Sequence, residues 1–311
     1  GNTLDTGGDI SIRGKGYASN WGAYQLNGVF KNLGSTDINS GTGKINIHGI
    51  APTTQTDATS VGVYVTGGTN HYFTSSNTNS NAITIIGDSS QSQSTASEGV
   101  ILRESSGQFE IVAAGSGGGV SIIAKGGAND DAVIQLNDPV YVLAKDGDVE
   151  IKAESSNEFG RLYSDSGGSL TLGYTAAENT HYDVTSSSSN IRITSSGSIY
   201  KEGLLTAKTD GGNFTIASDL GSNDSGTINL RGGLDVSTNG GNITLGGGDL
   251  LASGYALGES TSTLTEGVRI DKKLNLNSTT VIASRNNELI IDSTKLSSED
   301  KIKILPVISG G

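Results

Sequence analysis

A five-residue pattern of polar and apolar positions recurs along the chain. Each unit has a small turn residue, one spacer, an apolar residue, a residue that is polar in all units but one, and a second apolar residue; Gly43-Lys44-Ile45-Asn46-Ile47 is an example. Successive side chains of a strand point to opposite faces, so each unit predicts a short β-strand with two apolar residues inside. The twelve units have as their first apolar residues Ile10, Ile45, Ile83, Phe109, Val120, Val149, Leu170, Ile191, Phe214, Ile228, Ile243 and Leu289.

Small residues open these units: nine begin with Gly, two with Asn and one with Ser. Gly and Asn tolerate the left-handed backbone conformation, so we expect a tight corner with positive φ before each strand. The chain has 46 Gly but only 3 Pro, which fits frequent turns between strands whose N–H groups are hydrogen-bonded. No apolar run keeps helical spacing, and the sequence therefore predicts an all-β fold.

The spacing of the units predicts a solenoid. Nearly equal steps separate Val149, Leu170, Ile191 and Phe214, and each step matches one coil of a three-sided parallel β-helix. The longer steps before Ile83 are expected to be two coils or one coil with an inserted loop. The shortest steps, such as the one that follows Phe109, are expected to join neighbouring faces of one coil. We therefore expect a right-handed parallel β-helix of about 13 coils, roughly 60 Å long at one strand spacing per coil.

The whole chain, 1–311, is expected to form a single continuous β-helix, and its start at Gly1 without Met leads us to expect a processed chain or a fragment of a longer filament. The stretch 246–266 is a candidate bend. Insertions in a solenoid collect on its surface and often carry binding. Segments rich in Thr, Ser, Asn and Gln predict such surface loops at 52–60, 69–80, 88–98 and 179–190.

Composition agrees with a solenoid and disfavours several other classes of protein. Apolar residues make up 33% of the chain and aromatic residues 5%, too few for a compact globule but enough for a narrow core built coil by coil. The net charge of −12 opposes nucleic-acid binding and a membrane-surface helix. No apolar run approaches the roughly 20 residues of a membrane span, so no membrane insertion is expected.

Catalytic and metal sites are disfavoured by the residues at the outward positions. These positions are mostly Ser, Thr and Asn, with Glu110, Glu150 and Arg192 dispersed among them, whereas glycoside hydrolysis needs two carboxyl groups a few ångströms apart. The chain has no Cys, and its three His have no companion ligands at metal-site spacing. We expect a non-enzymatic protein with no catalytic residue, no metal and no cofactor.

A few aromatic residues are candidate ligand contacts. The segments Asn70-His71-Tyr72 and Thr180-His181-Tyr182 share a context, since each precedes a polar loop and then a strand. The single Trp, Trp21, lies near Tyr24 among small polar residues, and an aromatic face can stack on a sugar ring. His71, Tyr72, His181, Tyr182, Trp21 and Tyr24 either contact a glycan or pack over the corner of a coil.

Two of the Gly-rich units resemble the repeats of filamentous haemagglutinin-like exoproteins. They are Gly240-Gly241-Asn242-Ile243-Thr244-Leu245 and Gly7-Gly8-Asp9-Ile10-Ser11-Ile12, and similar strands recur through most of the chain. The resemblance implies a two-partner-secretion adhesin, exported through an outer-membrane β-barrel transporter, with a β-helical filament that acts in adhesion, aggregation or biofilm cohesion. It implies no catalytic residues.

The sequence and this resemblance together predict a secreted or cell-surface bacterial adhesin segment, either a stalk or a β-helix that presents a binding surface. The expected partner is a host or matrix glycan or a surface receptor. One alternative is a β-helical polysaccharide-processing enzyme or tailspike-like domain. Another is the passive stalk of a toxin-delivery filament, which has no ligand of its own.

Overall fold

The computed structural model contains only strands and irregular segments within its described residues, and nearly all of its strand pairs are parallel. The predicted all-β fold with parallel strands is therefore confirmed. The structure describes residues 2–5, 7–17, 25–31, 34–53, 59–68, 70–94, 97–103, 107–126, 133–137, 139–155, 161–164, 170–173, 190–220, 226–248, 256–257, 266–278, 281–285, 288–290 and 302–306.

The parallel strands form three rows, within which each strand pairs with its neighbours in the row. Row 1 contains β1 (Asn2–Asp5), β4 (Thr36–Asn39), β7 (Asn70–Ser75), the first parts of β10 (Gln108–Gly126) and β12 (Val140–Ser155), β14 (Leu170–Gly173), β17 (Leu205–Lys208), β20 (Gly233–Ser237) and β23 (Lys273–Asn277). Row 2 contains β2 (Ile10–Lys15), β5 (Ile45–Ile50), β8 (Ile83–Asp88), the last parts of β10 and β12, β15 (Ile191–Ser195), β18 (Phe214–Ser218) and β21 (Ile243–Gly247). Row 3 contains β3 (Gln25–Lys31), β6 (Thr59–Val65), β9 (Ser97–Arg103), β11 (Val133–Asn137), β13 (Arg161–Ser164), β16 (Ile199–Lys201), β19 (Ile228–Leu230) and β22 (Val268–Ile270).

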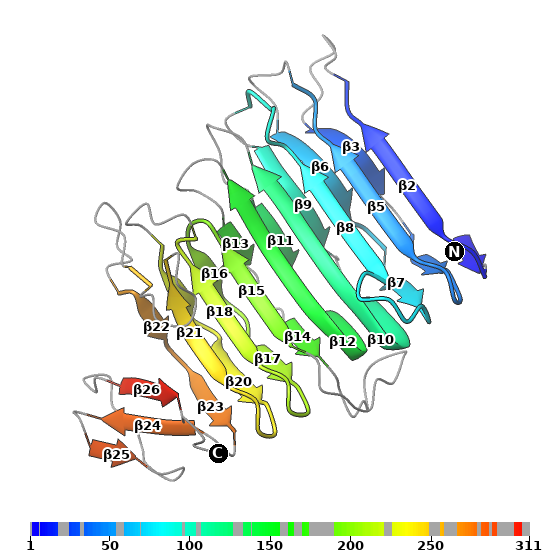
Figure 1. The fold of residues 1–311 in the computed structure, drawn as a ribbon. Coiled ribbons are helices and arrows are strands. Elements are labelled where there is room, and N and C mark those ends of the chain that lie inside the picture. Colours follow the sequence, from blue (N-terminus) through cyan, green and yellow to red (C-terminus); the bar gives the residue numbers. More distant parts are fainter. Residues whose placement is uncertain are drawn as a thin grey trace.

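The chain visits the rows in a fixed cyclic order, from row 1 to row 2 to row 3, and then returns to row 1. We call one passage through the three rows a circuit. The strands of successive circuits lie side by side, so the sequence colours advance steadily along the stack (Figure 1). The long strands β10 and β12 each bend from row 1 into row 2, which joins these rows into one 15-stranded sheet.

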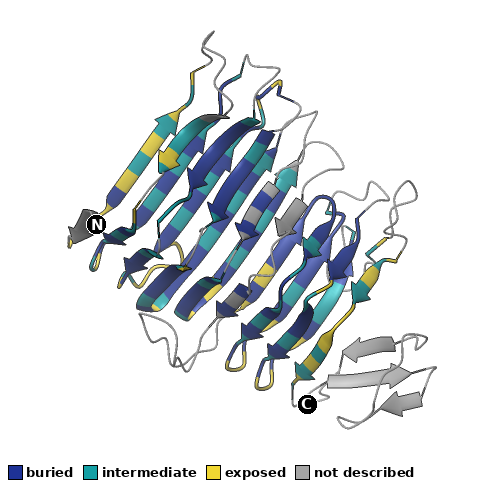
Figure 2. Ribbon diagram, turned by 180° about the vertical axis from the view of Figure 1, so that it is seen from behind, coloured by how far each residue is buried: buried dark blue, intermediate teal, exposed yellow. Residues whose placement is uncertain are grey.

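Inward-facing aliphatic residues stack in columns that run from circuit to circuit. In row 2 the first apolar residue of each unit pairs in register with the same residue of the next, from Ile10 through Ile45 to Ile83 and onward to Ile243. The second apolar residues, such as Ile47 and Ile85, form a parallel column. Buried and partly exposed positions alternate along these strands (Figure 2). The alternation read from the sequence is thus the side-chain alternation of the strands.

The opening Gly of a unit is required by stacking rather than by its φ angle. A Cβ on Gly147 would lie 2.1 Å from the carbonyl oxygen of Gly118, the opening Gly of the preceding circuit. Gly241 has the same relation to Gly212, at 1.9 Å. Of the opening Gly residues that the structure describes, only Gly107 has positive φ. Positive φ instead falls one residue earlier, at Gly117, Asp146, Gly211 and Gly240. The predicted corner is therefore present before these units, but the opening Gly itself is needed because close contact between successive circuits excludes a side chain there.

The spacer after the opening Gly connects neighbouring circuits. The backbone N–H of Asn213 donates to the side-chain oxygen of Asn190 at 3.0 Å, and that of Asn242 donates to Asn213 at 2.9 Å. Asp148 accepts the N–H of Asn190 in the same way. The spacer side chain therefore satisfies a backbone donor of the next circuit at the corner before row 2, where strand pairing has not yet begun.

Circuits vary in length, and only one of the three nearly equal steps is a circuit: Ile191 pairs with Phe214 in row 2, as predicted. Ile45 pairs with Ile83 in row 2, so the long step between them is one circuit and not two. The step from Leu170 to Ile191 is not a circuit, because Leu170 lies in row 1 while Ile191 lies in row 2. The described residues contain eight strands of row 3 and therefore eight circuits. At about 4.8 Å per circuit the stack is roughly 40 Å long instead of 60 Å.

Shorter features of the sequence agree with the structure only in part. The short step from Phe109 to Val120 joins row 1 to row 2 within β10, as predicted for neighbouring faces. The expected loop at 69–80 contains strand β7, and the candidate bend at 246–266 does not end the stack, because β22 pairs with β19. After the last parallel strand, β24 (Val281–Arg285), β25 (Glu288–Ile290) and β26 (Ile302–Pro306) form an antiparallel sheet, which differs from the expected continuous helix over 1–311.

Gly147→Ala should destabilise the protein, since the new methyl group would overlap the backbone of the preceding circuit. We expect the free energy of unfolding to fall by about 1–3 kcal/mol, measured by urea denaturation. Gly8→Ala is the matched control: Gly8 opens the unit of the first described circuit, and no atom lies within 4 Å of the place that its Cβ would occupy. Equal stability of the two variants would contradict the stacking explanation.

Asn213→Ala should remove the acceptor for the N–H of Asn242 and lower the free energy of unfolding by about 1 kcal/mol. Asn213→Asp keeps an oxygen at the same place and should retain most of that stability. Thermal unfolding of the two variants compares them directly. If Asp and Ala at this position are equally destabilising, the spacer side chain does not act through this hydrogen bond.

Candidate ligand-binding surface

Only two of the six candidate ligand residues belong to the described part of the chain. Trp21, Tyr24, His181 and Tyr182 lie outside the described residues. His71 and Tyr72 are consecutive residues of β7, so they point to opposite faces of row 1.

His71 lies inside the stack. It pairs in register with Thr36 on one side and Phe109 on the other, and its side chain is fully buried. The imidazole contacts the ring of Phe109, with 5.1 Å between centroids. Burial, and secondarily the charge of Lys31, lowers the pKa of His71 to about 4. The prediction that His71 contacts a ligand at the surface is therefore wrong, because the alternation of β7 places this side chain in the core.

Tyr72 lies on the outer side of row 1, between Asp37 and Glu110. Glu110 is fully buried and accepts a hydrogen bond from the amide of Gln108. Burial and the nearby Glu110 raise the pKa of Tyr141, which follows Glu110 in the same column. Because the Glu110 carboxylate is covered, a substrate in solution has no access to it in this structure.

The outer column of row 2 is formed by the polar residues at the centres of the units. Glu150 is the neighbour of Arg192 in register, and the Ser121 hydroxyl donates to Glu150 at 3.3 Å. Glu150 and Glu110 come from different rows, so the two carboxylates do not form the close pair that glycoside hydrolysis needs. The column consists of Ser11, Asn46, Thr84, Ser121, Glu150, Arg192, Thr215 and Thr244.

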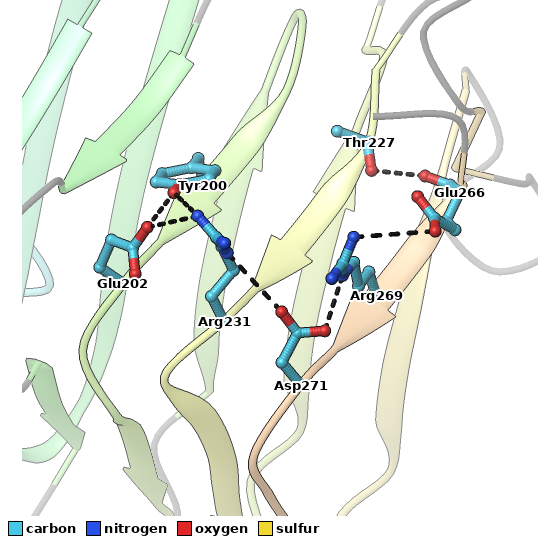
Figure 3. Close-up of polar contacts among 7 residues, drawn as sticks. All are labelled: Tyr200, Glu202, Thr227, Arg231, Glu266, Arg269 and Asp271. Atoms are coloured by element: carbon cyan, nitrogen blue, oxygen red, sulfur yellow. Dashed lines mark hydrogen bonds and ion pairs between the residues drawn. The ribbon is translucent and has the colours of Figure 1, made fainter. Parts of the chain in front are cut away.

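Arg side chains cross between circuits on the outer side of row 3. Arg231 donates to the Tyr200 hydroxyl at 2.9 Å and to Glu202 at 2.8 Å (Figure 3). Tyr200 donates to Glu202, and that hydrogen bond, ahead of the charge of Arg231, lowers the pKa of the Glu202 carboxyl. Asp271 of the following circuit lies 3.6 Å from Arg231. These groups satisfy one another, as expected for a clamp between circuits.

The same arrangement recurs near the N-terminal end of row 3. Arg103 donates to the Tyr64 hydroxyl from the next circuit, and its guanidinium carbon lies 5.1 Å from the Tyr64 ring centre. Tyr64 is buried and its ring is 5.4 Å from that of Phe30. Both Arg residues are thus used to hold adjacent circuits together.

A group of basic residues on the outer face of row 2 was not among the residues predicted from the sequence. Arg13 and Lys15 are exposed on β2, and His48 of β5 is the neighbour of Arg13 in register. The signal was present, because Ile10 and Ile12 face inward and every second residue after Ser11 must then face outward. Only the register of β2 against β5 shows that His48 joins them.

No family model, no curated protein and no solved structure matches this chain. Within the described residues, no cluster of three or more His, Asp or Glu side chains could hold a metal ion. The same residues contain no helix long and apolar enough to span a membrane. Any functional assignment therefore has to come from the stack and the chemistry of its outer faces.

The burial of His71 predicts a specific pH dependence of stability. A pKa of about 4 in the folded protein, against 6.5 for the ordinary residue, means that protonation favours the unfolded chain. Stability should be fully present above about pH 6.5 and should decline as the pH falls toward 4, by up to about 3 kcal/mol.

Urea denaturation between pH 7.5 and 4.5 measures this dependence. His71→Leu should flatten the decline, whereas His48→Gln, changed on the outer face, should keep it. Parallel pH profiles for the wild type and His71→Leu would show that another group is responsible.

Proposed function

We propose that this chain is a right-handed parallel β-helix that forms a ligand-presenting or stalk segment of a secreted bacterial surface adhesin, and that it is not an enzyme. One observation carries the proposal: all three rows pair in parallel from circuit to circuit along the whole stack. A stack of parallel strands of this kind places its variable side chains on outer faces, where an extended partner can contact several circuits at once.

The chemistry of these faces supports binding rather than catalysis. Hydroxyl and amide side chains dominate the outer column of row 2, and Glu110 is covered. The resemblance of the Gly-rich units to filamentous haemagglutinin-like repeats adds export through an outer-membrane β-barrel transporter and a place at the cell surface. The partner is a glycan of the host or matrix, or a surface receptor.

Beads coated with the purified chain test this function. They should be retained on epithelial cells or on immobilised glycans more strongly than beads coated with the heat-unfolded chain. Incubation with polysaccharides should leave their chain length unchanged, as measured by size-exclusion chromatography. Glu150→Gln, which alters an accessible carboxylate of row 2, should bind as the wild type does.

Shortening of a polysaccharide that is lost in Glu150→Gln would favour the enzyme instead. If the coated beads are retained on no surface, the ligand-presenting role is contradicted and a passive stalk is the remaining explanation.

A further inference from the structure

A basic patch lies on the outer face of row 2 at the first two described circuits. We define it as Arg13, Lys15, Tyr17 and His48. Arg13 and Lys15 alternate with inward residues of β2, and Arg13 is the register neighbour of His48 on β5. Side chains two residues apart on a strand are separated by about 6.6 Å, and those on neighbouring strands by about 4.8 Å. The patch therefore presents its cationic groups on one continuous surface.

The two permanent cations of the patch have no carboxylate partner among the described residues. Ion pairs between described residues join Lys152, Arg231, Arg269 and Lys273 to Asp or Glu, with Asp271 shared by the two Arg residues, and none includes Arg13 or Lys15. In the column of Lys15 the next acidic residue is Asp88, two strands away, where it accepts hydrogen bonds from Ser90. In a chain of net charge −12, two exposed cations that pair with no described carboxylate form a local positive region.

An aromatic side chain and neutral polar groups adjoin these cations. Tyr17, two residues after Lys15, is 88% exposed, the largest exposure among the large apolar and aromatic residues described. Ser11 and Asn46, register neighbours in the next column of the same face, offer a hydroxyl and an amide. An exposed ring provides a flat apolar surface for stacking, and the amide and hydroxyl can bond to sugar hydroxyls.

We propose that the basic patch binds an acidic polysaccharide, whose sugar rings carry carboxylate or sulfate groups. This inference rests on the proposed function, since it gives the ligand class and the site of the adhesin. Arg13 and Lys15 pair with anionic groups of the glycan, Tyr17 stacks on a ring, and Asn46 bonds to hydroxyl groups. The chain of sugars lies across β2 and β5.

The density of charge distinguishes this ligand from nucleic acid. Duplex DNA carries one negative charge per roughly 1.7 Å of its axis and needs many cations for tight binding. The patch offers two permanent cations on a protein of net charge −12, so a dense polyanion meets general repulsion. In an acidic glycan the anionic groups are separated by whole sugar rings, and this lower density of charge suits a patch with two cations spaced along a strand.

Protection of a sheet edge is the competing explanation. Among the described strands, β2 pairs only with β5, and charged residues on an edge strand discourage pairing with another chain. Edge protection requires no ligand and no particular role for Tyr17. The two explanations therefore differ in what the variants bind and in how they associate.

The test uses the whole chain and three oligosaccharides of equal length: a hyaluronan hexasaccharide with carboxylates alone, a heparin hexasaccharide with sulfates and carboxylates, and uncharged chitohexaose. Calorimetry should detect binding of at least one anionic probe and weaker binding as salt increases. The double variant Arg13→Gln/Lys15→Gln should lose at least tenfold in affinity for that probe. Which anionic probe binds tells whether carboxylate suffices or sulfate is needed.

The matched control is Lys208→Gln/Lys272→Gln, which removes the same charge at the far end of the stack and should bind like the wild type. Tyr17→Ala should weaken binding several-fold, and Tyr17→Phe should restore it, because the ring and not the hydroxyl stacks. Light scattering of each variant reports self-association.

Four results would overturn the proposal. The first two are no binding of either anionic probe, and equal losses of affinity in the two double variants. The other two are binding of a DNA duplex that depends on the patch as strongly as binding of the glycan does, and self-association of Arg13→Gln/Lys15→Gln with unchanged affinity for the glycan. If coated beads still adhere to cells while the anionic probes do not bind, the inference fails and the adhesin function stands. If beads do not adhere but the patch binds the probe, the adhesin function fails instead.

Discussion

Parallel, in-register stacking of each circuit on the one before it is the constraint on which the other features of this structure depend. Because Ile45 lies against Ile83 and Asn213 against Asn242, inward residues and spacer residues repeat their contacts from one circuit to the next. The inward columns supply a continuous apolar core from short strands, and this explains how a chain with 33% apolar residues folds without a globular interior. It also explains why a side chain is excluded at Gly147, where neighbouring circuits touch through their backbones.

The same constraint separates structural polar groups from groups that are free to meet a partner. Residues that cross between circuits are satisfied by the stack: Asn213 by a backbone N–H, and Arg231 by Tyr200 and Glu202. Arg13 and Lys15 differ, because they point away from the stack and have no ion pair with a described residue. An outer face built from repeated strands is flat and long, and it suits an extended ligand that contacts several circuits.

The candidate site could be read from the sequence only in part. The outer column of row 2 follows from strict alternation, and the sequence placed its Ser, Thr and Asn residues correctly. His71 was misplaced because the polar segment around it suggested a loop, whereas pairing with Thr36 and Phe109 makes it an inward residue of a strand. Its neighbour Tyr72 faces outward. A single step along a strand thus decides between core and surface, and a polar residue in the core carries no local sign of its position.

The sequence by itself determined the strands, their inward and outward sides and the parallel all-β class, because these depend on side-chain alternation and on corner residues within a few positions of each other. Only the tertiary structure decided which strand lies on which. The length of a circuit depends on the turns between rows, and these vary freely on the surface. The step from Leu170 to Ile191 therefore separates two rows, while the longer step from Ile45 to Ile83 closes one circuit. The basic patch follows from the same pairing, since Arg13 and His48 are distant in the chain and become neighbours only when β2 lies on β5.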